Sequence, residues 1–124
     1  MTQEDKDLLL KDLSARLPYN VVINNRRDDF NYNSFLTTDM LHELQSDYQP
    51  WEYKPYLRPL SSMTEEERNN LRECCRTQEG IIYDIGVAGA INCPVIIDFL
   101  NAHHLDYRGL IEKGLALAAP KGMY

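Results

Sequence analysis

The sequence has few cysteines and no long apolar run. Its three cysteines are Cys74, Cys75 and Cys93; the count is odd, and adjacent cysteines are poorly placed to bridge each other. This argues against a disulfide framework and favours a reducing compartment. No stretch approaches the roughly 18 consecutive apolar residues of a membrane-spanning helix, and the first residues are acidic where a secretory signal is basic. These absences predict a cytoplasmic protein that does not cross a membrane.

An excess of basic residues is also missing. The 124 residues include 13 Lys and Arg against 19 Asp and Glu, a formal net charge of −6, and neither half of the chain is basic. Proteins that bind nucleic acid usually gather positive charge on one surface, so nucleic-acid binding is disfavoured. A hydrophobic content of 44% and a charged content of 26% are ordinary for a globular protein. The length suits a single domain over residues 1–124 with a core of its own.

Catalytic and cofactor motifs are absent too, so the sequence predicts no cofactor, no metal and no catalytic residue. Gly86 and Gly89 lie between an expected strand and an expected helix, but GVAGAI does not match the GxGxxG fingerprint of dinucleotide-binding turns. Cys74 and Cys75 have no CxxC spacing and no nearby histidine in the sequence, which indicates packing rather than reactivity.

His103, His104 and Asp106 are the group of side chains best suited to chemistry. A histidine beside a carboxylate can act as a general base or bind a metal. Two consecutive histidines on a helix point about 100° apart, however, and neither HxxxH nor HExxH spacing is present. The favoured interpretation is structural, with His103 at the edge of the core, His104 in solvent and Asp106 as a helix cap. A small enzyme or metal-binding protein that uses these three residues is the alternative.

Apolar periodicity and capping residues predict about four helices. The expected spans are 2–17, 38–45, 65–78 and 94–105, with a further short helix over 107–113 that completes a C-terminal helical corner. Thr64 and Glu67 have the spacing of a capping box at the start of the third helix. Phe99 and Leu110 are expected to be the central core residues of the corner.

Short β-branched and aromatic runs predict a small antiparallel sheet. The expected strands lie in the regions 21–25, 50–54 and 81–85. The Asn- and Asp-rich stretch 24–33 is expected to be a turn or an exposed hairpin tip. Three prolines within 49–59 exclude an interior helix and predict an edge strand at Trp51 and Tyr53 followed by an extended connector. The fold class is therefore α+β, with helices packed on a small sheet.

Aromatic and basic side chains alternate in the same proline-rich segment. The predicted binding residues are Trp51, Tyr53, Lys54, Tyr56 and Arg58. Interleaved rings and cations are typical of surfaces that hold a peptide or single-stranded nucleic acid, and Tyr, Trp and Arg dominate protein interfaces. The alternative is that the rings only cover the edge of the core. Because the net charge of −6 opposes approach to phosphate, a protein partner is favoured over nucleic acid.

Three segments carry a resemblance to known sequences. They are 1–19 (MTQEDKDLLLKDLSARLPY), 54–67 (KPYLRPLSSMTEEE) and 98–124 (DFLNAHHLDYRGLIEKGLALAAPKGMY). They resemble a family of short uncharacterised proteins from Bacteroides-type gut bacteria and their phages, whereas 20–50 and 80–95 show no close correspondence. The family brings no activity, cofactor or site residue with it. The resemblance implies only a setting, that of a prophage or mobile-element accessory protein, and the expected function is a non-enzymatic interaction.

Overall fold

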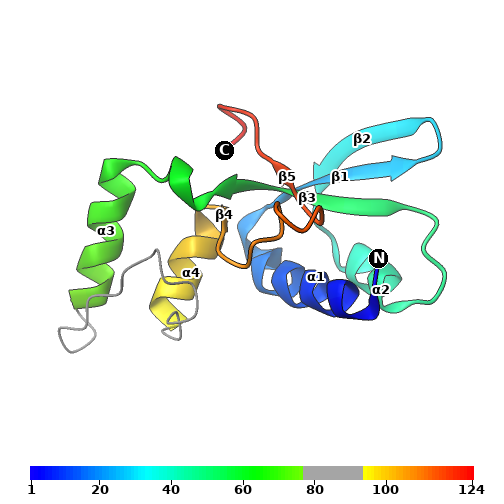
Figure 1. Ribbon diagram of the computed structural model, residues 1–124, viewed down its shortest axis with the longest axis horizontal. Coiled ribbons are helices and arrows are strands. Elements are labelled where there is room, and N and C mark those ends of the chain that lie inside the picture. Colours follow the sequence, from blue (N-terminus) through cyan, green and yellow to red (C-terminus); the bar gives the residue numbers. More distant parts are fainter. Residues whose placement is uncertain (77–93) are drawn as a thin grey trace.

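The computed structural model describes residues 1–76 and 94–124, which form an α+β arrangement (Figure 1). The helices are α1 (Gln3–Arg16), α2 (Thr38–Gln45), α3 (Glu65–Arg76) and α4 (Pro94–Ala102), and the strands are β1 (Val22–Arg27), β2 (Phe30–Phe35), β3 (Glu52–Pro59), β4 (Leu105–Asp106) and β5 (Leu117–Ala118). The predicted fold class is confirmed. No helix in the described part of the chain is long and apolar enough to cross a membrane.

The sheet is organised around β3. Its strands follow the order β2-β1-β3-β4, and β5 also pairs with β3. The β1–β2 and β1–β3 pairs are antiparallel, while the short strands β4 and β5 run parallel to β3. The regions 21–25 and 50–54 were both expected to contribute strands to an antiparallel sheet, and they do so as neighbours; the two parallel additions were not predicted.

The prediction of an extended connector after the short strand at Trp51 and Tyr53 is wrong, because the strand continues to Pro59. Residues 52–55 of β3 pair with β1 alone, with Pro55 in register with Ile23, and residues 56–59 pair with β4 and β5. Residues of a strand direct their backbone groups alternately to either side. The carbonyl of Tyr56 is directed towards β1, where a tyrosine hydroxyl joins it to the N–H of Val22. The position of the N–H that Pro55 lacks is therefore directed away from β1, and the β1–β3 ladder loses no bond there.

Local capping signals place the helix starts well. The Thr2 hydroxyl accepts from the Asp5 N–H at 3.1 Å. The Thr64 hydroxyl accepts from the Glu67 N–H at 3.1 Å, while the Glu67 carboxylate accepts from the Thr64 N–H at 2.9 Å, which completes the predicted capping box. α2 has the expected span 38–45, and its N-cap is Thr37, whose hydroxyl accepts from the Met40 N–H at 3.4 Å.

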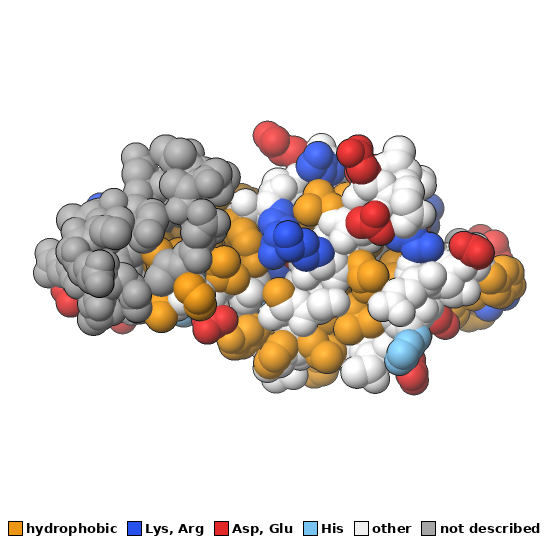
Figure 2. Space-filling view, turned by 90° about the horizontal axis from the view of Figure 1, so that it is seen from below, with side chains coloured by type: hydrophobic (Ala, Val, Ile, Leu, Met, Phe, Trp, Pro, Cys, Tyr) orange, Lys and Arg blue, Asp and Glu red, His pale blue; other side chains and the backbone are white. Residues whose placement is uncertain are grey.

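The described residues form two groups of buried apolar side chains. α1 and α2 cover one face of the sheet and bury Leu9, Leu13 and Leu44 against β1 and β3. The second group lies where α3 and α4 approach β4 and includes Leu71 and Leu100. Seen from the helix side, basic and acidic side chains are interspersed among apolar ones rather than gathered into a patch of one sign (Figure 2).

Three further predictions need correction. Residues 107–113 form a run of turns rather than a helix, although Leu110 is fully buried as expected. Phe99 is only partly buried, because it packs on the outside of the second apolar group. The stretch 24–33 contains the expected exposed hairpin tip, but the turn is confined to the two residues between β1 and β2 and the rest is paired strand.

Several predicted features lie outside the described residues. These are the strand expected at 81–85, the turn around Gly86 and Gly89, and Cys93. Cys74 and Cys75 belong to α3, but their side chains are not among those described. Those expectations stay predictions.

Candidate interaction site

The five predicted binding residues divide between the two faces of β3, because successive strand residues point to opposite sides. Tyr53 lies with Leu57 on the face that α1 and α2 cover, and Trp51 packs against the same apolar group. Lys54, Tyr56 and Arg58 occupy the alternate positions and are half-buried. The segment therefore does not form one continuous binding surface.

Trp51 lies just before β3, near the turn of the β1–β2 hairpin. Its ring meets that of Tyr32 edge to face, with centroids 5.5 Å apart and an interplanar angle of 85°. The guanidinium of Arg27 lies over the indole, 5.9 Å from the ring centroid. Trp51 is thus half-buried, and one strand of the hairpin supplies a cation while the other supplies a second ring.

Tyr53 and Arg58 serve mainly to join elements. The Tyr53 hydroxyl donates to the carboxylate of Glu43 on α2, and burial, together with that carboxylate, raises the pKa of Tyr53. The guanidinium of Arg58 forms a bidentate hydrogen-bonded pair with the carboxylate of Glu67 of α3, with N–O distances of 2.7 and 2.8 Å. This hydrogen bonding holds the pKa of Glu67 down at about 2, against the opposing effect of its burial. The polar groups of both side chains are therefore engaged in hydrogen bonds within the chain.

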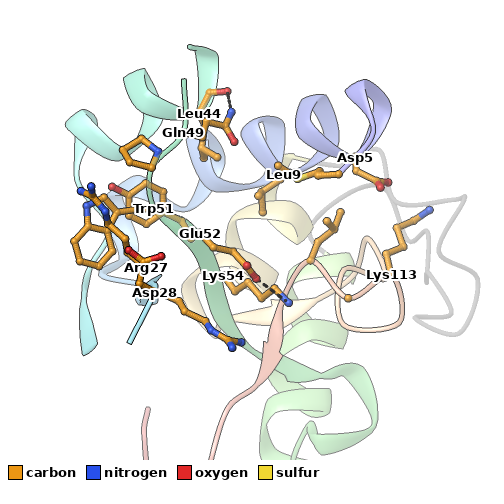
Figure 3. Close-up of a pocket in the computed structure, with 16 residues that line it drawn as sticks. Asp5, Leu9, Arg27, Asp28, Leu44, Gln49, Trp51, Glu52, Lys54 and Lys113 are labelled. Atoms are coloured by element: carbon orange, nitrogen blue, oxygen red, sulfur yellow. Dashed lines mark hydrogen bonds and ion pairs between the residues drawn. The ribbon is translucent and has the colours of Figure 1, made fainter. Parts of the chain in front are cut away.

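A groove of about 840 Å³ lies beside the N-terminal half of β3 (Figure 3). It is lined by Met1, Asp5, Leu9, Arg26, Arg27, Asp28, Leu44, Gln49, Pro50, Trp51, Glu52, Tyr53, Lys54, Lys113, Gly114 and Leu115. Three of the five predicted residues, Trp51, Tyr53 and Lys54, are among them, whereas Tyr56 and Arg58 are not. The size is that of sites that hold a small ligand or a short stretch of peptide.

The groove is more basic than the chain that forms it. Four Lys and Arg side chains and three Asp and Glu side chains line it, whereas the whole chain carries 13 and 19. Figure 3 shows Trp51 and Arg27 at one end, Lys113 at the other and Lys54 between them. Lys54 pairs with Glu52 at 3.2 Å. Arg26 and Lys113 have no ion-pair partner among the described residues and are available to a ligand.

His103, His104 and Asp106 do not converge. His103 Nδ1 lies 3.0 Å from a carboxylate oxygen of Glu67. The His104 ring stacks on Tyr124, with centroids 3.6 Å apart, and burial lowers the pKa of His104 to about 4. The Asp106 carboxylate is occupied by the N–H groups at 110 and 111, which donate to it at 2.9 and 3.0 Å.

These contacts qualify the sequence-based interpretation of the histidines. His104 is half-buried, which corrects the expectation that it faces solvent, and it has a positive φ of 59°. Asp106 caps a turn rather than the predicted helix. Among the side chains that the structure describes, those of residues 1–73 and 94–124, no three from His, Cys, Asp or Glu are grouped so that they could hold a metal ion.

Sequence reasoning missed a buried charged cluster next to α1. Asp12 accepts from Arg16 Nε at 2.7 Å and from Arg108 Nε at 3.2 Å. Arg16 also donates to the carbonyl of Leu105 at 2.7 Å, and the ring of Tyr107 lies within 5.2 Å of both guanidinium carbons. The spacing of Asp12 and Arg16, four residues apart and adjacent to Leu9 and Leu13, was the available signal. The cluster ties α1 to the segment after α4.

No family model, curated protein or solved structure matches this chain. The sequence resemblance of segments 1–19, 54–67 and 98–124 is thus not tested by these comparisons and stays a prediction. The candidate site rests on the geometry of the groove alone.

Proposed function

We propose that this protein acts without catalysis and binds a protein partner in the groove beside β3. The observation that carries the proposal is the composition of this groove, in which an acidic protein places four cationic side chains around the apolar surface of Trp51 and Leu115. Interfaces gain most of their binding energy from a few aromatic and Arg residues set among apolar contacts. Trp51 and Arg27 supply this combination at one end of the groove.

The expected ligand is a short segment of the partner that carries an apolar side chain next to carboxylates. The apolar side chain would pack on Trp51, and the carboxylates would meet Arg26 and Lys113, whose charges are unpaired among the described residues. Nucleic acid suits the molecule less well, because the net charge of −6 opposes a polyanion.

The proposed setting is the cytoplasm, with a prophage or mobile element as the source. The small number of cysteines favours the first, and the resemblance of about half the chain to proteins of gut bacteria and their phages favours the second. The alternative based on His103, His104 and Asp106 is not advanced, since their contacts lie apart from one another.

The test uses a displayed library of random peptides selected on the full chain. Enriched peptides are synthesised and titrated against the protein by intrinsic fluorescence, which reports on the groove because Trp51 is the one tryptophan of the sequence. The variant Arg26→Gln/Lys113→Gln should weaken binding about ten-fold, because it removes the two cations that are expected to meet the carboxylates of the ligand. The control Lys11→Gln/Lys121→Gln makes the same charge change at two exposed positions away from the groove and should leave binding unchanged.

The outcomes separate the parts of the proposal. Enrichment of acidic peptides that shift Trp51 fluorescence supports it. Peptides that bind equally well to both double variants would place the site elsewhere. Retention of a single-stranded oligonucleotide by the groove, with no peptide enriched, would replace the protein partner by nucleic acid.

A further inference from the structure

The β1–β2 hairpin leaves one strand at the edge of the sheet. Within the described residues β2 pairs with β1 alone, at the opposite end of the strand order from β4. The hairpin projects away from α1 and α2, so that its outer edge is open along its length (Figure 1). A strand in this position presents unpaired backbone donors and acceptors to any strand that approaches it.

β2 lacks the features that usually protect an edge. Its sequence, FNYNSF, contains no charged residue, no proline and no glycine. Phe30, Tyr32 and Phe35 are 71%, 51% and 61% exposed, so half of its side chains are large rings in contact with solvent. Both properties favour pairing with another strand.

The register identifies which backbone groups are free. The N–H of Leu36 donates to the carbonyl of Val21 at 3.0 Å, which directs the backbone of residue 36 towards β1. By alternation the backbone groups of Asn31, Asn33 and Phe35 are directed outwards. The free groups are therefore centred on Asn33.

We propose that β2 pairs antiparallel with β2 of a second copy of this chain, about a two-fold axis at Asn33. In this register Asn33 faces Asn33 of the second copy, and Asn31 faces its Phe35. No charge of β2 meets a like charge, because the strand has none. The two hairpin turns, with Asp28 and Asp29, lie at opposite ends of the pair, whereas a parallel arrangement would bring these acidic turns together.

A second copy also suits this edge better than an unrelated strand, because its β2 carries no charge. The strand that complements β2 is uncharged and carries rings on both faces, and β2 itself has this composition. Phe30 and Tyr32 lie on the face of Trp51, and Phe35 lies on the opposite face. Two-fold pairing of identical surfaces is also the commonest form of self-association. This inference does not depend on the groove or its ligand.

Sedimentation velocity and native mass spectrometry of the full chain test the proposal. The wild type should form a dimer as its concentration rises into the hundreds of micromolar. Asn33→Lys and Asn33→Asp should each raise the dimer dissociation constant about five-fold, because like charges then face each other across the axis. An equimolar mixture of the two variants should form the heterodimer, identified by its mass. Asn31→Lys is the matched control, since its charge faces an uncharged Phe35.

Two results would overturn the proposal. One is a wild type that stays monomeric at every concentration; the other is a dimer that both Asn33 variants leave unchanged. Hydrogen exchange of the wild type gives a measurement that needs no variant. The amides of Asn31, Asn33 and Phe35 should become protected as concentration rises, and equal exchange at low and high concentration would contradict strand pairing.

Discussion

At the scale of single residues, the most constrained charge is that of Asp12. It has no exposed side-chain surface and faces two guanidinium groups, those of Arg16 and Arg108. Arg16 is equally buried, and its Nη1 has no hydrogen-bond partner in the described structure. A buried ion pair of this kind adds little net stability by itself, but loss of one partner leaves an uncompensated charge.

We expect Asp12→Ala to lower the free energy of unfolding by roughly 3–5 kcal/mol, because Arg16 then lies buried without a counter-charge. Urea denaturation followed by circular dichroism measures the loss. The double variant Asp12→Leu/Arg16→Met should recover most of it by replacing the pair with apolar groups. A loss below about 1 kcal/mol for the single variant would show that the guanidinium reaches solvent.

His104 should make stability depend on pH in the weakly acidic range. Burial lowers its pKa from 6.5 to about 4. As pH falls through this window, the unfolded chain binds a proton that the folded protein does not, so the free energy of unfolding falls with pH. Glu67 affects stability at lower pH. Because its pKa in the folded protein is held down at about 2, its contribution to the free energy of unfolding is lost as the pH falls below about 4.5.

Urea unfolding at about pH 7 and about pH 5 isolates the histidine, because Glu67 keeps its charge in both conditions. We expect His104→Asn to show a smaller stability loss between these pH values than the wild type. Asparagine tolerates the positive φ of 59° at this position. An unchanged pH dependence in the variant would assign the effect to another group.

At the scale of elements, helix starts follow from local chemistry, and burial depends on what the helix meets. α4 begins at Pro94, as expected from the preference of proline for a first turn. Its most buried apolar residues are Ile96 and Leu100, at 1% and 0% exposure, whereas Phe99 faces the rim of the second apolar group. The apolar periodicity of the segment predicted which side of α4 is buried, but not which residue lies at the centre of that side.

We therefore expect Leu100→Ala to cost more stability than Phe99→Ala. Leu100 is fully buried, so its truncation should leave a cavity and cost about 2–5 kcal/mol. Phe99 is partly exposed, and its surroundings can relax or admit water, which makes its loss smaller. Chemical denaturation of both variants, compared with the wild type, ranks them. The reverse order would mean that Phe99 anchors α4.

At the scale of the whole molecule, the last residues of the chain join strands that are distant in sequence. The Ala119 N–H donates to the carbonyl of Leu57 at 2.8 Å, next to the β3–β5 pair. Farther on, the Tyr124 hydroxyl accepts from the Val22 N–H at 2.9 Å and donates to the Tyr56 carbonyl at 2.7 Å. The Tyr124 hydroxyl therefore replaces a direct hydrogen bond between Val22 of β1 and Tyr56 of β3.

Tyr124→Phe should lower the free energy of unfolding by about 0.5–1.5 kcal/mol, because the bridge between Val22 and Tyr56 is lost while the ring stack on His104 is kept. Tyr48→Phe is the matched control, since Tyr48 is 74% exposed and its hydroxyl makes no hydrogen bond within the described chain. Thermal unfolding of the two variants gives the comparison. Equal melting temperatures would show that water replaces the bridge at no cost.

The candidate site was only partly predictable. Trp51, Tyr53 and Lys54 were identified because rings and cations alternate in one short segment, which is a local property. Arg27 and Lys113 lie far from that segment in sequence and reach the groove only through the hairpin and the turn before β5. Arg58 lies outside the groove and pairs with Glu67, a contact that becomes apparent only when the first turn of α3 meets the end of β3.

The sequence by itself determined the fold class, the starts of α1, α3 and α4, and the presence of strands in the regions that contain β1 and β3. These depend on capping side chains, proline and apolar spacing, which act over a few residues. Only the tertiary structure decided that β3 continues to Pro59, that 107–113 is a run of turns, and that Asp12 lies between two arginines. Each of these depends on contacts between distant segments, where burial and partner geometry outweigh local preference.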